Sequence, residues 1–302
     1  MRIGLGLDLK GTVDEVAERA RILAATGVRS LWSSQLFGWD VLTALAVVGR
    51  EVPGVEFGTA VVPVQPRHPM MLAAQALTVQ SACGGRLTLG IGLSHQVVVE
   101  GVWGGSFIRP ARYMEEYLTV LIPLLQGENV AFEGEHLRTN TFTPVEAPGA
   151  VSPPVVLAAL GPRMLRIAGE RTEGTVTWMV GPRTVADHIV PTITAAASKA
   201  GRVTPRVVVT LPVCVTDDPD AARTRADRIF AAYGQLPSYR AMLDREGAGS
   251  PCDVAIVGDE AAVTAEIRRI EEAGATEFSG AVYGSPDEVN RSRALLGALA
   301  TA

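Results

Sequence analysis

The hydrophobic and polar positions of the chain alternate between two periods. Short runs of aliphatic and β-branched residues predict buried strands, and each run is followed by a segment in which apolar residues recur at helical spacing. The predicted strands are 3–9, 28–33, 55–64, a run within 84–95, 154–160, 174–180, 207–215 and 277–283. The predicted helices are 12–27, 40–48, 69–82, 111–125, a segment beginning at 162, 185–200, 219–233, 237–246, 259–273 and 286–300.

This alternation of strand and helix predicts the fold class. Eight β/α units in about 300 residues are typical of a (β/α)8 TIM barrel, here expected as a single domain over 1–302. Alternating residues on both sides of Gly134 add a β-hairpin over 129–141, inserted after the fourth barrel helix. A doubly wound sheet is less favoured, because the turn after the first strand does not match the G-x-G-x-x-G fingerprint.

The stretch Gly84–His95 is the most informative part of the chain. Gly90 and Gly92 would weaken a strand unless another group approaches its backbone closely. Ser94 and His95 then follow at the carboxyl end, where ligands bind in parallel α/β folds. Two interpretations are open from the spacing: the floor of an active site, or a core strand followed by an ordinary turn.

Composition narrows the class of protein. Of the 302 residues 47% are hydrophobic, yet no apolar run reaches the roughly 20 residues of a membrane span. The chain enters a strand at once without a signal sequence, which predicts a cytoplasmic protein. A net charge of −5 disfavours nucleic-acid binding. Lys10 and Lys199 are the only lysines among many arginines, a composition typical of high-GC bacteria such as actinobacteria.

The four histidines and three cysteines give little sign of metal or thiol chemistry. None is paired at metal-ligand spacing, so no metal site is expected, and no G-x-S-x-G motif is present. His68 precedes Pro69 and is expected to cap a helix, while His136 and His188 are expected to have no role in function. His95, at a strand end, is the candidate proton donor, because its ordinary pKa lies near neutrality.

Two further patterns suggest a ligand. Gly161, Pro162 and Arg163 begin a helix in a way that would favour a phosphate, although Gly-Pro is also simply a good helix start. Four tryptophans fall at or just beyond strand ends and could wall a flat cavity for a planar ring. They are Trp32, Trp39, Trp103 and Trp178, of which the last three are expected in the substrate pocket.

Three motifs together resemble the luciferase-like monooxygenase superfamily, especially its branch of coenzyme F420-dependent oxidoreductases. The motifs are Phe57–Pro63 with Arg67-His68-Pro69, Gly84–Gly92, and Ala158–Arg163. A further stretch, Ser94–Gly104, looks like one bacterial subgroup of that branch. The resemblance covers nearly the whole chain.

The resemblance implies roles for individual residues. A non-prolyl cis peptide behind the deazaflavin ring matches near Ala60-Val61, and His95 matches a position where some relatives place a glutamic acid. The remaining cofactor-binding residues implied are Gly92, Leu93 and Ser94 beside the ring, Gly161, Pro162 and Arg163 at the phosphate, Thr177 on the neighbouring strand, and Ser34 and Gln35 after the second strand.

One departure from the family pattern bears on the reaction. Many F420 enzymes have Ser-Asp-His after the second strand, whereas this chain has Ser34-Gln35-Leu36. The missing histidine disfavours alcohol or sugar oxidation. The sequence therefore predicts a reductase that transfers hydride from reduced F420 to an unsaturated small molecule, an enone or imine. An FMN-dependent monooxygenase is the alternative, a flavin-binding barrel without catalysis is a third possibility, and a homodimer is expected because relatives are often dimers.

Overall fold

A computed structural model describes residues 1–302, which form two compact units. Unit 1 contains residues 1–7, 19–32 and 159–302, and unit 2 contains residues 8–18 and 33–158. Helix α1 (Val13–Ala24) runs through the boundary between the two ranges. None of the helices is both long and apolar enough to cross a bilayer.

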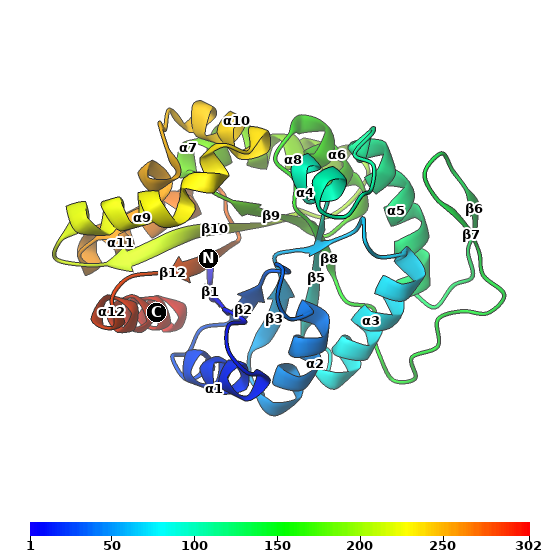
Figure 1. The fold of residues 1–302 in the computed structure, drawn as a ribbon, viewed down its shortest axis with the longest axis horizontal. Helices are drawn as coiled ribbons and strands as arrows, with labels where there is room; N and C mark the ends of the chain where they lie inside the picture. Colours follow the sequence, from blue (N-terminus) through cyan, green and yellow to red (C-terminus); the bar gives the residue numbers. More distant parts are fainter. The chain divides into compact units, whose positions relative to one another are not determined.

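Unit 1 is built on a parallel sheet. Strand β1 pairs with β2 on one side and β12 on the other, and β10 pairs with β12, β9 and β11. The strands are β1 (Arg2–Gly6), β2 (Ser30–Ser33, of which Ser33 belongs to unit 2), β9 (Gly174–Trp178), β10 (Arg206–Val215), β11 (Ile256–Gly258) and β12 (Glu277–Val282). The helices are α6 (Pro162–Arg171), α7 (Pro182–Thr184), α8 (Val190–Lys199), α9 (Pro219–Gly234), α10 (Pro237–Glu246), α11 (Glu260–Glu272) and α12 (Pro286–Thr301). In Figure 1, α12 lies beside the strand β12 that precedes it.

A buried carboxylate ties the strands of this sheet together. Glu277 on β12 is 1% exposed and accepts hydrogen bonds from Trp32 Nε1 at 2.7 Å and from Arg206 Nη2 at 3.0 Å. The hydroxyl of Ser30 donates to the same carboxylate. A buried charge is tolerated when it is paired and hydrogen-bonded in this way. Trp32 is therefore a core residue of unit 1.

The parallel strands of unit 2 are paired around β5. Strand β5 (Leu87–Gly92) pairs with β3 (Glu56–Thr59), β4 (Val62–Pro63) and β8 (Val155–Leu157). The helices are α2 (Val41–Glu51), α3 (Pro69–Ala82), α4 (Gln96–Gly101) and α5 (Pro110–Leu125). Strands β6 (Ala131–Glu133) and β7 (Arg138–Asn140) pair antiparallel after α5, and Figure 1 shows them as a separate hairpin beside that helix.

The hairpin is fastened to α5 by one buried side chain. Glu116 is 1% exposed and accepts backbone N–H bonds from Glu135, His136 and Leu137 at 2.8–3.1 Å. Burial works to raise the pKa of the Glu116 carboxyl, but these N–H donors and the Arg112 guanidinium outweigh it, so the pKa is lowered. The Glu116 carboxylate thus accepts the backbone N–H groups of three consecutive residues in the turn between β6 and β7.

Most predicted elements are present, with several differences. The predicted strand 55–64 is interrupted after Thr59, the segment before the predicted helix 111–125 contains the short helix α4, and the predicted helix 185–200 contains a π-helical turn over Val185–Ile189. Strand β11 was not predicted at all, because three residues carry too little periodicity. His68 caps α3 as predicted, since its Nδ1 accepts the backbone N–H of Met70 at 3.2 Å.

Strands β3 and β5 approach each other unusually closely at Thr59 and Gly90. The Thr59 hydroxyl donates to Gly90 O at 2.7 Å and accepts from Gly90 N at 2.8 Å. A Cβ atom on residue 90 would lie 1.8 Å from Thr59 O, which no real structure allows. The close approach predicted from the strand glycines is confirmed here.

We expect Gly90→Ala to lower the free energy of unfolding by about 3 kcal/mol, because backbone would have to move to admit the methyl group. Urea denaturation followed by circular dichroism measures this. Gly101→Ala is the matched control, since nothing lies within 4 Å of the Cβ it would add. Equal stabilities for the two variants would show that β3 and β5 do not meet as described.

Candidate active site

The break between β3 and β4 gathers the first group of predicted site residues. The Ala60-Val61 peptide bond is cis, at the position that the family resemblance implied. Ala60 N donates to Ser33 O at 2.7 Å, Ser34 Oγ donates to Ala60 O at 2.7 Å, and Gln35 N donates to Val61 O at 3.3 Å. Three consecutive residues at the end of β2 and just after it therefore hold the backbone of the break by one hydrogen bond each.

Gly92 lies against the same break. A Cβ on residue 92 would approach Val61 Cγ2 to 2.6 Å and Ala158 Cβ to 3.2 Å, so only glycine lets β5 end beside Val61. Gly92 O accepts from Val64 N at 3.0 Å, which continues the pairing past the break. The structure thus brings together Ser34, Gln35, Ala60, Val61 and Gly92. Thr59, which the sequence analysis did not single out, completes this group through its bonds to Gly90.

The chain turns sharply where β5 ends. Ser94 has a φ of 58°, a left-handed conformation that non-glycine residues seldom adopt and that is common at functional sites. His95 follows in an extended conformation as the first residue before α4. Burial lowers the pKa of the His95 imidazole. A half-buried histidine at a strand end can donate a proton in its protonated form, and burial makes that form more acidic than an exposed imidazolium.

The Gln35 side chain is hydrogen-bonded to the backbone of its own loop. Its Oε1 accepts from Val41 N at 2.8 Å, and its Nε2 donates to Leu36 O at 2.9 Å and to Trp39 O at 3.2 Å. Both ends of the side chain are therefore engaged in shaping the segment that leads into α2.

An ion pair between Asp40 and Arg67 supports the segment that leads from β2 into α2. Asp40 caps α2 through Thr43 N and pairs with Arg67. Burial works to raise the pKa of the Asp40 carboxyl, but the bonds from Thr43 and Arg67 outweigh it and lower the pKa. Arg67 is in turn held through its carbonyl, which accepts from Tyr117 Oη at 2.9 Å.

Two predicted pocket tryptophans of unit 2 are exposed rather than packed in its core. Trp39 is 49% exposed and donates from Nε1 to Gly11 O at 2.8 Å, while Trp103, which follows α4, is 36% exposed. Their indole faces are thus open to solvent in this structure. Their place in a substrate pocket stays a prediction.

In unit 1 the predicted phosphate-binding residues begin α6. Gly161 is the N-cap, with φ −76° and ψ 155°, and Pro162 is the first helical residue, where its missing N–H costs no hydrogen bond. Nothing lies within 4 Å of where a Cβ of residue 161 would be, so the helix start is open on that side. Arg163 follows within the first turn, which makes this end of α6 positive in character.

Strand β9 supplies the remaining predicted residues of unit 1. Thr177 is buried and its hydroxyl lies 3.5 Å from Val208 O, whereas Thr175, two residues earlier on the same face, donates to Ala159 O at 3.3 Å. Of these two threonines Thr175, not the predicted Thr177, is bonded to the segment that enters α6.

Trp178 ends β9 in an aromatic cluster. Its ring packs edge-to-face against Phe230, with centroids 5.8 Å apart, and against Tyr233 at 5.6 Å. Trp178 Nε1 is buried without a hydrogen-bond partner. Met179 follows with a φ of 57°, so β9, like β5, has a left-handed non-glycine residue within two positions of its end.

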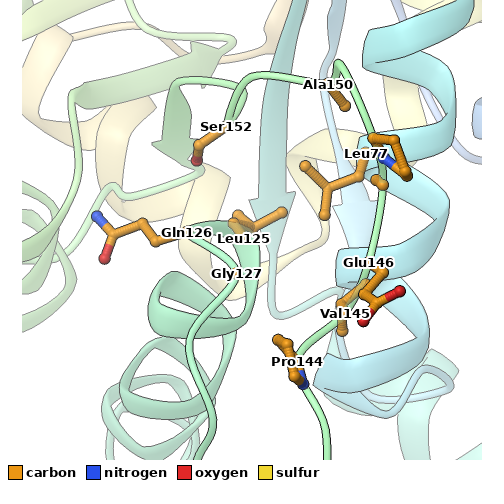
Figure 2. Close-up of a pocket in the computed structure, with 11 residues that line it drawn as sticks. Leu77, Leu125, Gln126, Gly127, Pro144, Val145, Glu146, Ala150 and Ser152 are labelled. Carbon is orange, nitrogen blue, oxygen red and sulfur yellow. The ribbon is translucent and has the colours of Figure 1, made fainter.

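A cavity elsewhere in unit 2 contains none of these residues. Its volume is about 510 Å³, and it lies between the ends of α3 and α5 and the segment that precedes β8 (Figure 2). Leu77, Gln126 and Ser152 line it. Ser152 lies three residues before β8, and so near the amino end of that strand. The candidate residues lie instead at the carboxyl ends of strands. No group of three or more His, Cys, Asp or Glu side chains could hold a metal ion.

Comparison with solved structures identifies the fold. The coenzyme F420-dependent tetrahydromethanopterin reductase of Methanopyrus kandleri superposes with a TM-score of 0.84 over 98% of each chain, at 21% identity. The oxygenating constituent of 3,6-diketocamphane monooxygenase from Pseudomonas putida, solved with FMN, gives 0.77 over 98% of this chain and 96% of that one, at 17% identity. These likenesses confirm the luciferase-like (β/α)8 barrel.

Sequence comparison identifies the family. The family model described as luciferase-like monooxygenase matches residues 1–292, so the chain belongs to this family. A 5,10-methylenetetrahydromethanopterin reductase of Methanolobus tindarius is 27% identical over 249 residues, 82% of this chain and 75% of that protein. An F420-dependent glucose-6-phosphate dehydrogenase of Nakamurella multipartita is 30% identical over 222 residues, 72% and 63% of the two chains. The prediction of a luciferase-like oxidoreductase is confirmed.

The lowered pKa of His95 can be measured directly. We expect its imidazole to titrate below the ordinary histidine value of about 6.5, because burial disfavours the charged form. Long-range 1H–15N correlation spectra across pH 4.5–8 would follow the ring, with its signals assigned by their loss in His95→Gln. A midpoint at or above 6.5 would show that the side chain is more hydrated than the structure indicates.

Proposed function

We propose that this protein is a coenzyme F420-dependent reductase that transfers hydride to an enone or imine. The observation that carries the proposal is the backbone at Ala60-Val61. It is held by hydrogen bonds with Ser33, Ser34 and Gln35 and is packed against Gly92, at the position where the family resemblance implies the deazaflavin ring. The named F420-dependence of relatives over most of the chain supports the same cofactor.

The residues present fit such a cofactor. The break and the backbone of Gly92, Leu93 and Ser94 offer a surface of peptide groups and small side chains on which a flat ring can rest. The open start of α6, with Gly161, Pro162 and Arg163, offers peptide N–H groups and a guanidinium for a phosphate. Trp39, Trp103 and Trp178 remain the proposed aromatic contacts of the substrate.

The protein's own chemical contribution is a proton. Reduced F420 supplies a hydride when bound. An enone that gains a hydride at its β-carbon must also gain one proton at the α-carbon or oxygen, and an imine must gain one at nitrogen. His95 is the proposed donor, because it lies at the strand end and its protonated form is made more acidic by burial.

The direction of the reaction follows from what the chain lacks. Gln35 stands where many F420 enzymes have the aspartate of Ser-Asp-His, and Leu36 stands where they have the histidine. Gln35 is engaged with Val41, Leu36 and Trp39 and cannot accept a proton from an alcohol. We therefore favour reduction over alcohol oxidation. The homodimer expected from relatives stays a prediction.

Cofactor choice is the first test. We expect F420 to bind with a dissociation constant at least about tenfold lower than that of FMN, measured side by side by fluorescence quenching, because relatives that match most of the chain are named as F420-dependent. The reverse preference would contradict the reductase proposal. It would favour the FMN-dependent monooxygenase, which oxygen-consumption assays with reduced FMN would then examine.

The role of His95 is the second test. We expect His95→Ala to lower turnover of an enone by about 100-fold with reduced F420 while leaving F420 affinity unchanged, because only the proton donor is lost. In the wild type the rate should fall as pH rises through the lowered His95 pKa, since a general acid must be protonated. The variant should lose that limb. An unchanged rate and pH profile would remove His95 from the mechanism.

A further inference from the structure

His188 occupies a position that its place in the sequence did not indicate. It lies in the π-helical turn Val185–Ile189 between α7 and α8, is 8% exposed, and its Nε2 is 2.8 Å from Leu160 O. A carbonyl oxygen only accepts, so Nε2 carries the hydrogen. No functional role was expected for His188 from the sequence, yet its side chain holds Leu160, the residue directly before Gly161.

This bond fixes the direction of a peptide group at the start of α6. In a trans peptide the C=O and the N–H of the next residue point in opposite directions. Holding Leu160 O toward His188 therefore aims the Gly161 N–H away from it. The bond from Thr175 to Ala159 O fixes the preceding peptide plane in the same way. Both peptide groups that lead into α6 are set by side chains from outside the helix.

The helix that follows His188 is firmly seated against α6. A Cβ on Gly169 of α6 would lie 2.4 Å from Ile193 O and 2.9 Å from Ala196 Cβ, so only glycine permits this approach. Close packing without voids transmits a position from one helix to another. The π-helical turn adds a residue just before this contact, a feature often found at functional sites. His188 is thus held on a rigid element.

We propose that His188 is a positioning residue for the cofactor phosphate: through Leu160 O it aims the Gly161 N–H and the first turn of α6 at that phosphate. The inference rests on the proposed function, because it takes F420 as the ligand of this helix start. His188 itself need not touch the cofactor. Thr175 acts as a second, weaker support of the same segment.

The test compares F420 with a truncated form that ends at the ribityl hydroxyl and lacks the phosphate. We expect His188→Leu to raise the dissociation constant of F420 about tenfold and that of the truncated form less than twofold, because only the phosphate contact is misaligned. His188→Gln, whose Nε2 can still donate to Leu160 O, should recover most of the F420 affinity. A general loss of structure would weaken both ligands alike.

Two further variants keep the test decisive. Thr175→Val should shift the ratio of the two constants in the same direction by a smaller factor, and it serves if His188→Leu does not fold. His136→Leu, the same change on the hairpin of unit 2, should leave the ratio unchanged. An unchanged ratio in both His188→Leu and Thr175→Val would overturn the inference while leaving the proposed function intact. Failure of the wild type to bind F420 would overturn both.

Discussion

The contact between Thr59 and Gly90 is the constraint on which the candidate site of unit 2 depends. Because the Thr59 hydroxyl takes both the N–H and the C=O of residue 90, β3 follows β5 only as far as Thr59. The chain then leaves the ladder at Ala60 and Val61 and rejoins it at β4. The segment after β2 bonds to the groups exposed by this departure, and Gly92 gives Val61 room. One cross-strand contact therefore places five predicted site residues.

In unit 1 the candidate site is positioned by side chains that hold backbone carbonyls, not by a close contact between strands. Its helix start at Gly161 has no side-chain cap of its own, so its geometry comes from neighbours. Thr175 and His188 hold the two preceding carbonyls from β9 and the turn before α8. A backbone site built this way can leave its N–H groups to a ligand, because the supporting side chains use only the carbonyl oxygens. Support from the carbonyl side and binding on the amide side are compatible for that reason.

The parts of the fold that the sequence predicted are those with a local physical cause. Asp40 and His68 cap helices through their own side chains, and the glycines of β5 signalled a close approach that the structure contains. The parts that were missed depend on distant partners. Strand β11 is a strand only because β10 is long enough to pair with it. The Leu160–His188 bond joins residues 28 positions apart, and no spacing in the sequence reports it.

The site residues divide in the same way. Gly161-Pro162 could be recognised from helix-start chemistry alone, whereas Ala60-Val61 needed the family resemblance, because nothing in an Ala-Val pair indicates its backbone. Ser94 and Met179 carry a structural sign of a functional site that neither the helix-start chemistry nor the family resemblance includes. Both adopt left-handed backbone just beyond a strand, Met179 directly after β9 and Ser94 two residues after β5, although neither is glycine. Such conformations persist only where the surroundings enforce them, so they mark the ends of β5 and β9 as sites independently of any relative.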